Sequence, residues 1–399
     1  MSFRTLRDID VKGHRVFLRA DLNVPLKDGA ITDATRIRET LPTLNHLLAG
    51  GASVVLCSHL GRPKGTGFEA EFSLAPVAAW LKAQGLDLAL ASGVTGPKVE
   101  AEAAALRPGQ VLLLENLRFD KGETKNDPGF AKALARLADT YVNDAFGSAH
   151  RAHASVSGMV ADFPPERTVA GFLLEKELTA LGKVMDQPER PLLAIMGGSK
   201  VSDKIGIIRH FFGKADTILI GGAMSFTFLK AMGVAIGNSR CEEDKLELAN
   251  TLRQEAEAAG TRLLLPLDHM VAATIDADAE CDITQDQAVP DGKMGLDIGP
   301  ETVAIYTEEI RKARTILWNG PMGVFELDPF ASGTLTLAEE MADAADRGAF
   351  VLVGGGDSVT AAAKAGVTRR LSHISTGGGA SLEFLSGMEL PGVAALQIK

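Results

Sequence analysis

The sequence lacks several features that would assign it to a class of protein at once. No apolar run approaches the roughly 18 residues that a membrane-spanning helix needs, and the opening stretch MSFRTLRDIDVKG carries charges where a signal peptide would have an apolar block. The three cysteines, Cys57, Cys241 and Cys281, lie far apart and show no metal-ligand spacing. We therefore expect a cytoplasmic protein with reduced thiols, no membrane partner and no cysteine-based metal site.

Two familiar nucleotide-binding motifs are also absent. The pattern G-x-x-x-x-G-K-[ST] occurs nowhere, and the dinucleotide pattern G-x-G-x-x-G fails at GGGDSV (354–359), because Val359 stands at its third glycine. This argues against a dehydrogenase, and we expect no binding of NAD(H). The formal net charge of −10 argues against a nucleic-acid partner, because such binding depends on cationic patches that meet phosphates.

The chain does contain a regular alternation of short apolar runs with longer stretches of helical period. The runs of strand length are residues 14–20, 53–58, 86–91, 111–116, 140–144, 192–196, 216–220, 262–267, 314–318, 349–353 and 371–375. This alternation is typical of parallel sheets with crossover helices and predicts an α/β fold. A length of 399 residues favours two domains, and a proline-bracketed turn that ends the helical stretch 171–191 puts their boundary near residues 186–191.

The residues that follow the strands differ between the two halves. Ligands of open α/β sheets bind beyond the carboxyl ends of the strands, so these residues indicate the binding sites. In the second half they are glycines, as in IMGGSK, ILIGGAM, ILWNGPMG, VLVGGGDS and HISTGGGA. In the first half they are polar and cationic, as in FLRADLN, LCSHLGRPKG, LLENLRFDKG and VNDAFGSAHRAH. The sequence therefore predicts one site lined by backbone and one lined by arginine and histidine.

The glycine-rich turns outline a nucleotide site, since glycine lets backbone approach a ligand and a following helix directs free N–H groups at phosphate. Lys200 and Lys204 would share one face of a helix that begins just after Gly197 and Gly198, with Val201, Ile205 and Ile208 as its buried stripe. The alternative for either lysine is a solvated surface group.

Two single carboxylates are further candidates for this site. Asp357 is either a helix N-cap, aided by Ser358, or a Mg²⁺ ligand beside phosphates. Glu326 is either a ribose acceptor or a surface carboxylate, and Trp318 is expected in the core.

The cationic strand ends predict a pocket for a small ligand with more than one negative group. The cations are Arg36, His59, Arg62, Arg118 and Arg151. Asp21 and Asn23 would contact hydroxyl groups of that ligand. Each arginine taken singly could equally be a solvated surface group.

The chain resembles the phosphoglycerate kinase family. Ten of its segments occur in the order of that family: RADLNVP, SHLGRPKG, LLENLRF, AHRAHAS, GGSKVSDK, GGAMSFTFLKA, MGLDIGP, WNGPMGVFE, GGGDS and STGGGASLEFL. The departures are small: Leu22 stands where the family often has Phe, Ser199 where Ala is common, and Ala223 where some members have Gly. None of them replaces a charged group.

The resemblance implies two Rossmann-like domains, each a parallel sheet flanked by helices, with a hinged cleft between them. It implies a 3-phosphoglycerate domain at residues 1–185, a nucleotide domain at 186–379 and a final segment, 380–399, that packs back on the first domain. The implied substrate residues are Asp21, Asn23, Arg36, His59, Arg62, Arg118 and Arg151. The implied nucleotide residues are Lys200, Lys204, Gly295, Asn319, Glu326, Gly354, Gly355, Gly356, Asp357 and Ser358. Asp357 would hold Mg²⁺, and the implied catalytic residues are Arg36, Lys200, Gly377 and Gly378.

The implied reaction is reversible phosphoryl transfer between ATP and the carboxylate of 3-phosphoglycerate in glycolysis, with ADP and 1,3-bisphosphoglycerate as the other pair. We expect a monomer that closes about residues near 171–191 and 375–380. Two other interpretations stay open at this point. One is a different ATP-dependent carboxylate kinase, which a substrate panel would identify. The other is a two-domain binding protein without chemistry, which an ATPase assay with 3-phosphoglycerate would exclude.

Overall fold

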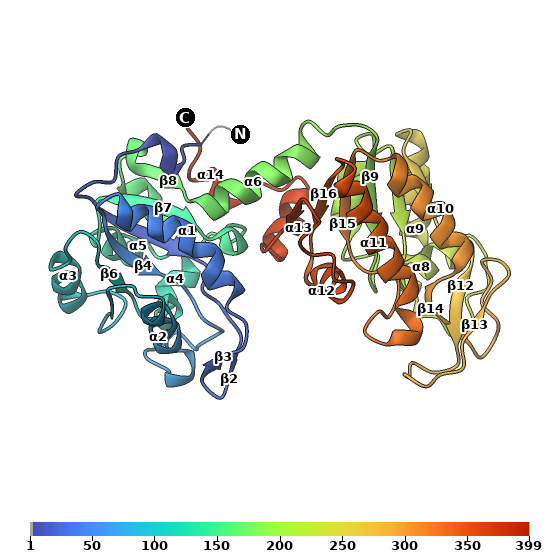
Figure 1. The fold of residues 1–399 in the computed structure, drawn as a ribbon, viewed down its shortest axis with the longest axis horizontal. Helices are drawn as coiled ribbons and strands as arrows, with labels where there is room; N and C mark the ends of the chain where they lie inside the picture. Colours follow the sequence, from blue (N-terminus) through green and yellow to red (C-terminus); the bar gives the residue numbers. More distant parts are fainter. Residues whose placement is uncertain (1–2, 399) are drawn as a thin grey trace. The chain divides into compact units, whose positions relative to one another are not determined.

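The computed structural model describes residues 3–398, and the chain divides into two compact units (Figure 1). The first unit is Met1–Thr179 with Glu389–Lys399, and the second is Ala180–Met388. The chain leaves the first unit within helix α6 (Phe172–Met185) and returns to it after Met388. Residues 380–388 therefore group with the second unit, and only the last part of the expected C-terminal segment groups with the first.

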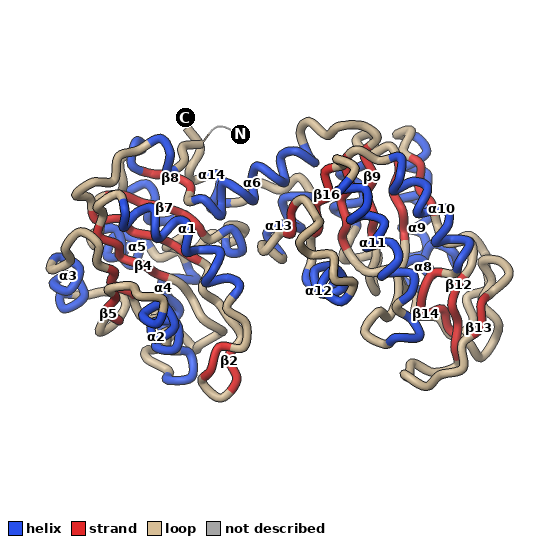
Figure 2. The backbone as a smooth tube through the Cα atoms, viewed as in Figure 1, coloured by secondary structure: helices blue, strands red, loops and turns tan. Residues whose placement is uncertain are grey.

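The first unit is built on a sheet of six parallel strands in the order β5-β6-β4-β1-β7-β8 (Figure 2). The strands are β1 (Arg15–Ala20), β4 (Ser53–Cys57), β5 (Leu88–Leu90), β6 (Val111–Leu113), β7 (Thr140–Asp144) and β8 (Thr168–Ala170). The helices around it are α1 (Thr35–Ala49), α2 (Ala75–Ala83), α3 (Pro97–Ala104), α4 (Lys121–Lys125), α5 (Pro128–Ala135) and, from the returning segment, α14 (Pro391–Ala394). A two-stranded ribbon, β2 (Leu26–Lys27) and β3 (Ala30–Ile31), precedes α1.

The second unit repeats this plan with a sheet in the order β11-β10-β9-β15-β16-β17. Its strands are β9 (Leu192–Met196), β10 (Thr217–Ile220), β11 (Arg262–Leu264), β15 (Thr315–Asn319), β16 (Phe350–Val353) and β17 (His373–Ile374). Its helices are α7 (Ile205–Phe211), α8 (Met224–Ala231), α9 (Leu246–Ala258), α10 (Pro300–Lys312), α11 (Ser332–Asp346), α12 (Gly356–Lys364) and α13 (Gly379–Leu385). A small antiparallel sheet adds β12 (His269–Ala272), β13 (Asp282–Ile283) and β14 (Met294–Ile298) in the order β13-β12-β14.

The predicted α/β class is confirmed, and each of the eleven predicted runs contains a strand of one of the two parallel sheets. Strands β1, β4, β7, β9 and β15 are buried along nearly their whole length, which explains their unbroken apolar sequences. The small antiparallel sheet and strand β8 were not predicted, because their strands are short and have no long apolar run.

Parallel pairing brings the functional segments to one edge of each sheet. In the first unit β1 lies between β4 and β7, so Ala20, Cys57 and Asp144 end at the same edge. In the second unit β9 lies between β10 and β15, which places the segments after Met196 and Asn319 side by side. The residues that follow these strands are therefore neighbours in space, as the strand-end argument requires.

Asp144, the last residue of β7, fixes the start of α6. Its Oδ1 accepts hydrogen bonds from the backbone N–H groups of Leu173 at 2.8 Å and Leu174 at 3.2 Å. Burial raises the pKa of this carboxyl group to about 6. The helix that passes between the units thus begins on a buried carboxyl group of the first sheet.

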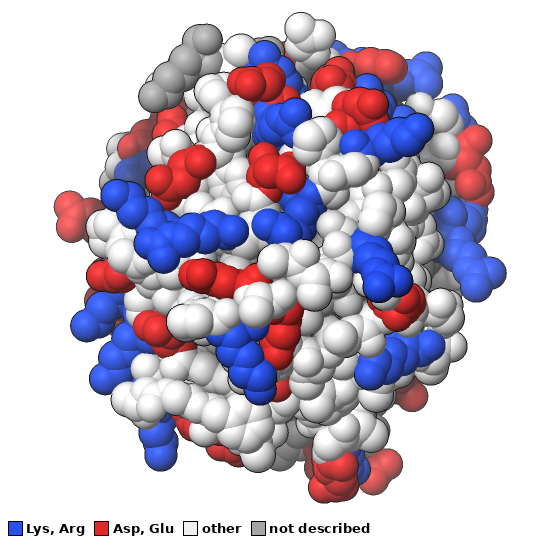
Figure 3. Space-filling view, turned by 90° about the vertical axis from the view of Figure 1, so that its left-hand side faces the viewer, with Lys and Arg blue, Asp and Glu red and all other residues white. Residues whose placement is uncertain are grey.

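The surface charge is mixed. On the face shown in Figure 3, lysine and arginine side chains are interspersed with aspartate and glutamate, without a continuous basic area. On this face, therefore, the cationic side chains are not gathered into one large patch. Among the described residues, no helix combines the length and apolarity that crossing a bilayer requires.

Candidate active site

The first unit pairs Asp21 with Arg36 at the carboxyl end of its sheet. Asp21 follows β1 and is buried, and Arg36, in the first turn of α1, donates from Nη1 to Asp21 Oδ2 at 2.5 Å. A Cβ atom at Gly147 would lie 2.4 Å from Asp21 Oδ2, so glycine at that position leaves room for the carboxylate. Asn23 Oδ1 accepts from the Gly61 backbone N–H at 2.9 Å. These contacts hold the loops after β1 and β4 together.

His59 and Arg118 lie in the same cluster. Arg118 donates from Nη1 to the Gly61 carbonyl at 2.7 Å, and its pKa is lowered to about 10 by burial and then by the positive charges of Arg151, Arg19 and Arg62. Burial, followed by the charges of Arg19, Arg118 and Arg36, lowers the pKa of His59 well below its ordinary value. The structure thus brings the predicted cations of the first half together, with His59 neutral.

Three arginines of this cluster carry uncompensated charge. In the described part of the chain, no carboxylate oxygen lies within 4.0 Å of a side-chain nitrogen of Arg62, Arg118 or Arg151. Arg62 and Arg151 are exposed, and Arg151 Nε donates to His150 Nε2 at 3.2 Å. An unpaired group of guanidinium ions is a site for a ligand with several negative oxygens.

Arg19 is a member of this cluster that the sequence argument missed. It lies in β1, its side chain is fully buried, and its Nη2 is 3.3 Å from His59 Nδ1. The sequence did contain a sign that Arg19 is buried, because it is the one charged residue in the otherwise apolar run 16–20. A charge inside a strand of a parallel sheet is buried and needs partners.

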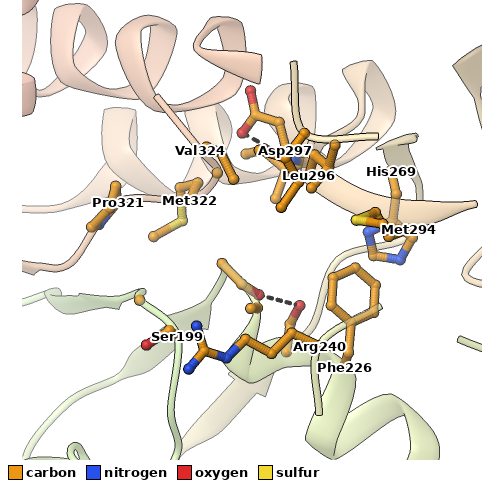
Figure 4. Close-up of a pocket in the computed structure, with 18 of the residues that line it drawn as sticks. Ser199, Phe226, Arg240, His269, Met294, Leu296, Asp297, Pro321, Met322 and Val324 are labelled. Carbon is orange, nitrogen blue, oxygen red and sulfur yellow. Dashed lines mark hydrogen bonds between the residues drawn. The ribbon is translucent and has the colours of Figure 1, made fainter. Parts of the chain in front are cut away.

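The second unit holds a pocket of about 290 Å³ at the glycine-rich edge of its sheet (Figure 4). Its walls include the apolar side chains Phe226, Met294, Leu296, Met322 and Val324. Among the residues predicted for the nucleotide site, Gly295, Glu326 and Asp357 line it directly. A mostly apolar cavity with a few polar groups suits a nucleotide base and its ribose.

The apolar wall was also missed, since it comes largely from the small antiparallel sheet and from α8. His269 and Met294 come from β12 and β14, and Phe226 comes from α8. Burial lowers the pKa of His269 to about 4, so the imidazole is neutral. Arg240 crosses the pocket with its guanidinium group toward Ser199 (Figure 4).

Asp297 is another residue of the pocket lining, and its carboxyl group is buried. Its Oδ2 accepts from the Gly333 backbone N–H at 2.7 Å, and its Oδ1 accepts from the Ile298 N–H at 2.9 Å. Burial nevertheless raises the pKa of Asp297 to about 7, since these two bonds offset only part of the desolvation. This carboxyl group connects strand β14 to the start of α11.

The segment GGSKVSDK differs from the expected helix. Residues 199–201 are irregular, residues 202–204 form a turn, and α7 begins only at Ile205, so Lys200 and Lys204 do not share a helical face. Val201 and Ile208 are buried as predicted, while Ile205 is only partly buried. Lys200 is exposed.

Lys204 is placed by Asn319. The Lys204 ammonium group donates to Asn319 Oδ1, and Asn319 Nδ2 donates to the Gly354 carbonyl at 2.9 Å. Burial lowers the pKa of Lys204, and the negative charges of Asp203 and Asp357 oppose this shift. Lys204, Asn319 and the GGGDS loop are therefore one connected group.

Gly197 has a different role from the expected one. A Cβ atom there would lie 2.0 Å from the Pro321 carbonyl oxygen and 2.7 Å from that of Gly320. The missing side chain lets the segments after β9 and β15 pack backbone against backbone, so Gly197 does not make room for a ligand. Gly198, with φ of +115°, is the one of the pair that lines the pocket.

The GGGDS loop (residues 354–358) also differs from the expected arrangement, in which Asp357 could be the helix N-cap. Gly355, with φ of +90°, precedes α12, and Asp357 lies in the first turn of the helix. The interpretation of Asp357 as N-cap is therefore wrong, and the carboxylate is exposed at the pocket, where the positive end of the helix dipole favours it. Ser358 Oγ accepts from the Gly320 N–H at 2.6 Å. Trp318 is buried in the core, as predicted.

Residues 3–398 show no cluster of metal-ligating side chains. The described residues contain no group of three or more His, Cys, Asp or Glu side chains that could hold a metal ion. A single exposed carboxylate such as Asp357 fits Mg²⁺, which is commonly bound by one or two carboxylates, water and substrate phosphates.

Gly377 and Gly378 stand just before α13, at the same edge of the second sheet. The Gly377 N–H donates to Ser375 Oγ at 3.2 Å, and Gly378 has a φ of +53°. Their backbone thus begins a helix beside the GGGDS loop, since a Cβ atom at Gly354 would be 3.9 Å from Leu385 of α13.

Comparison with known proteins gives one family. The family model described as phosphoglycerate kinase matches residues 6–388. The phosphoglycerate kinase of Chlorobium chlorochromatii is 54% identical over 399 residues, which cover 99% of this chain and 100% of that protein. That of Moorella thermoacetica is 55% identical over 400 residues, with full coverage of both chains. The structure of phosphoglycerate kinase from Coxiella burnetii superposes with a TM-score of 0.91 at 41% identity, and the match covers 99% of each chain.

Proposed function

The chain belongs to the phosphoglycerate kinase family, and from this we propose how its residues carry out the reaction of that family. It is an enzyme of glycolysis with phosphoglycerate kinase activity, which transfers a phosphoryl group between ATP and the carboxylate of 3-phosphoglycerate. The substrates of the family are 3-phosphoglycerate and Mg-ATP.

The first unit binds 3-phosphoglycerate. The observation that carries this assignment is the group of arginines, Arg62, Arg118 and Arg151, that lack carboxylate partners at the sheet edge. Arg62 and its neighbours bind the phosphate that does not react, and Arg36 binds the carboxyl end. Asp21 and Asn23 contact the hydroxyl group. A ligand with a phosphate at one end and a carboxylate at the other satisfies this distribution of charge.

The second unit binds the nucleotide. The base lies against the apolar wall near Gly295, and Glu326 accepts hydrogen bonds from the ribose. Lys204, Asn319 and the loop Gly354, Gly355, Gly356, Asp357 and Ser358 lie at the phosphates. Asp357 would hold Mg²⁺, whose charge would offset that of the phosphate oxygens.

The chemistry requires no general base. The acceptor is a carboxylate that is already ionised at neutral pH, so the protein has to hold the partners in line and neutralise charge. Lys200, Arg36 and the backbone amides at Gly377 and Gly378 stabilise the negative oxygens of the phosphoryl group during transfer. Positioning of this kind supplies roughly 7–11 kcal/mol when reacting atoms are about 3–3.5 Å apart.

Two substrates bound to different units must be brought together for transfer. We therefore propose a hinge at residues near 171–191 and 375–380. The chain leaves the first unit within the former range, after Thr179, and returns to it after Met388, a few residues beyond the latter range. Small-angle scattering with both substrates bound tests this, because closure lowers the radius of gyration. An unchanged radius would contradict the hinge.

The protein acts in the cytoplasm as a monomer, without nucleic-acid or membrane partners. Sedimentation at enzyme concentrations used for assays tests the monomer. The residue assignments are tested by steady-state kinetics with Mg²⁺, ATP and 3-phosphoglycerate. Substitutions in the first unit should change the KM for 3-phosphoglycerate, and substitutions at the pocket should change the KM for ATP.

A further inference from the structure

The side chain of Arg19 is surrounded by acceptors inside the first unit. Its Nε donates to Ser155 Oγ at 2.8 Å, and its Nη1 donates to the Ala20 carbonyl. Nη2 faces His59 Nδ1 at 3.3 Å and lies 3.5 Å from Ser148 Oγ. The guanidinium group is fully buried, so it cannot exchange these partners for water.

A buried carboxylate fixes the orientation of Arg19 through a hydroxyl group. Ser155 Oγ accepts from Arg19 and donates to Glu123 Oε1 at 2.7 Å, while Glu123 Oε2 accepts from the Ser155 backbone N–H at 3.0 Å. Glu123 is fully buried and is the countercharge of this network. The guanidinium plane is therefore held in one position relative to the His59 ring.

This geometry determines the protonation of His59. A guanidinium group has donors and no acceptor, and it stays protonated in proteins. A proton on His59 Nδ1 would set two donors against each other at 3.3 Å in a buried site. Both the Nδ1–H tautomer and the imidazolium ion carry that proton, so both are disfavoured.

We propose that Arg19 is a positioning residue that holds His59 as the neutral Nε2–H tautomer, so that the imidazole offers an N–H donor to the anionic substrate of the first unit. The tautomer follows from the contacts of Arg19 alone. The contact of Nε2–H with 3-phosphoglycerate rests on the proposed function. Nε2 makes no hydrogen bond to any residue between 3 and 398, and it is the ring nitrogen left for a ligand.

The other cations near the ring act in the same direction. Arg36 and Arg118 add positive potential at His59, while His153, with its pKa lowered to about 4 by burial, is neutral near pH 7. Glu123, one hydroxyl group beyond Arg19, is the opposing negative charge. With burial and Arg19, these cations lower the pKa of His59. A neutral donor adds a hydrogen bond to the arginine cluster without adding a charge that the other cations would repel.

Side-chain ¹H–¹⁵N NMR of the wild-type enzyme tests the tautomer directly. The chain has eight histidines, and the His59 signals are assigned by their loss in His59→Gln. The expected spectrum is that of a neutral ring protonated at Nε2, without titration between about pH 5 and pH 8. An Nδ1–H ring, or a titration midpoint inside that range, overturns the proposal.

Arg19→Lys tests the cause. The ammonium group keeps the charge but cannot direct separate donors to Ser155 and His59, so His59 should populate both tautomers. A His59 spectrum identical to that of the wild type would overturn the role of Arg19. Should this variant not fold, the wild-type spectrum still decides on the tautomer.

The role of Nε2 toward substrate is tested by two amides that differ in reach. The amide nitrogen of His59→Gln lies near the position of Nε2, and that of His59→Asn lies near Nδ1. We expect the KM for 3-phosphoglycerate to rise about tenfold more in His59→Asn than in His59→Gln, with the KM for ATP nearly equal in the two. Equal KM values for 3-phosphoglycerate would overturn the substrate contact and leave the tautomer to the spectrum, so the two failures are distinguishable.

Discussion

A substitution at Gly197 tests the backbone packing beneath the nucleotide pocket. In Gly197→Ala the new Cβ atom would lie 2.0 Å from the Pro321 carbonyl oxygen, whereas ordinary contacts begin at 3.4 Å. The segments after β9 and β15 must therefore separate by about 1.4 Å, the difference of these two distances. The separation breaks or strains two hydrogen bonds, from Gly197 N–H to the Asn319 carbonyl and from Gly198 N–H to the Pro321 carbonyl, both 3.1 Å long.

The expected cost is about 4 kcal/mol in the free energy of unfolding of the second unit. Overpacking against backbone contributes roughly 1–3 kcal/mol, and each weakened hydrogen bond contributes about 0.5–1.5 kcal/mol. Because Gly198 lines the pocket, binding of ADP should weaken in the same variant. The matched control is Gly182→Ala in α6, where a Cβ atom meets only Asp186 Oδ2 at 3.8 Å. That change should stabilise the protein by about 0.5–1 kcal/mol, since alanine is the better helix former.

The assay uses the two tryptophans of the chain, Trp80 in the first unit and Trp318 in the second. In a Trp80→Phe background, the fluorescence of the buried Trp318 reports urea unfolding of the second unit alone. A Gly197→Ala variant within about 0.5 kcal/mol of its parent would refute the reasoning. If Gly182→Ala lowered the free energy of unfolding equally, the loss of stability in Gly197→Ala could be attributed to replacing any glycine and not to the contact with the Pro321 carbonyl oxygen.

Three further predictions concern single side chains. Lys200→Ala should lower kcat by roughly 10²–10³ in steady-state assays, because it removes one charge that stabilises the transferred phosphoryl group; a change of only a few-fold would contradict that role. Arg62→Ala should raise the KM for 3-phosphoglycerate about tenfold and leave kcat nearly unchanged, since it binds a phosphate that does not react; an equal loss in kcat would place it at the reacting group. The raised pKa of Asp297 means that the folded state binds its proton more tightly than the unfolded state, so the unfolding free energy should fall by about 4 kcal/mol as pH rises from about 4 to about 7. Asp297→Asn should lack this fall in urea titrations followed by Trp318 fluorescence, and an unchanged pH dependence would show that the buried carboxyl group does not cause it.

The cationic site could be predicted from the sequence because parallel strands bring their ends to one edge. Arg36, His59, Arg62, Arg118 and Arg151 are separated by up to 115 positions in the chain, yet each lies in or next to a strand-end loop. Asp357 and the glycine-rich turns could be predicted for the same reason, since they also follow strands of a parallel sheet. Such a prediction needs only the positions of the strands, and apolar runs predict these well.

The remainder of the site depends on tertiary contacts that no local pattern encodes. Residues 199–204 form no helix, and the side chain of Lys204 contacts Asn319, more than 100 residues away in the chain. The sequence pattern suggested that Gly197 contacts a ligand. The structure shows instead that glycine is needed there because the Pro321 carbonyl oxygen lies close to it. Phe226 and Met294 were not predicted to line the pocket, because Phe226 lies within helix α8 and Met294 lies in a small sheet with short strands.

The return of the chain to the first unit has a consequence for its synthesis. The Gly392 N–H donates to the Ala149 carbonyl at 2.8 Å, Asn143 Nδ2 donates to the Gly392 carbonyl, and Phe3 forms a bridge with Gln397. A ribosome makes residues 1–179 first, but these contacts cannot form until residues 392–397 have been translated. The second unit, which is contiguous in sequence, has all of its own residues before the first unit does. A nascent chain stalled near residue 388 should therefore expose an incomplete N-terminal lobe to chaperones and proteases while its C-terminal lobe is already whole.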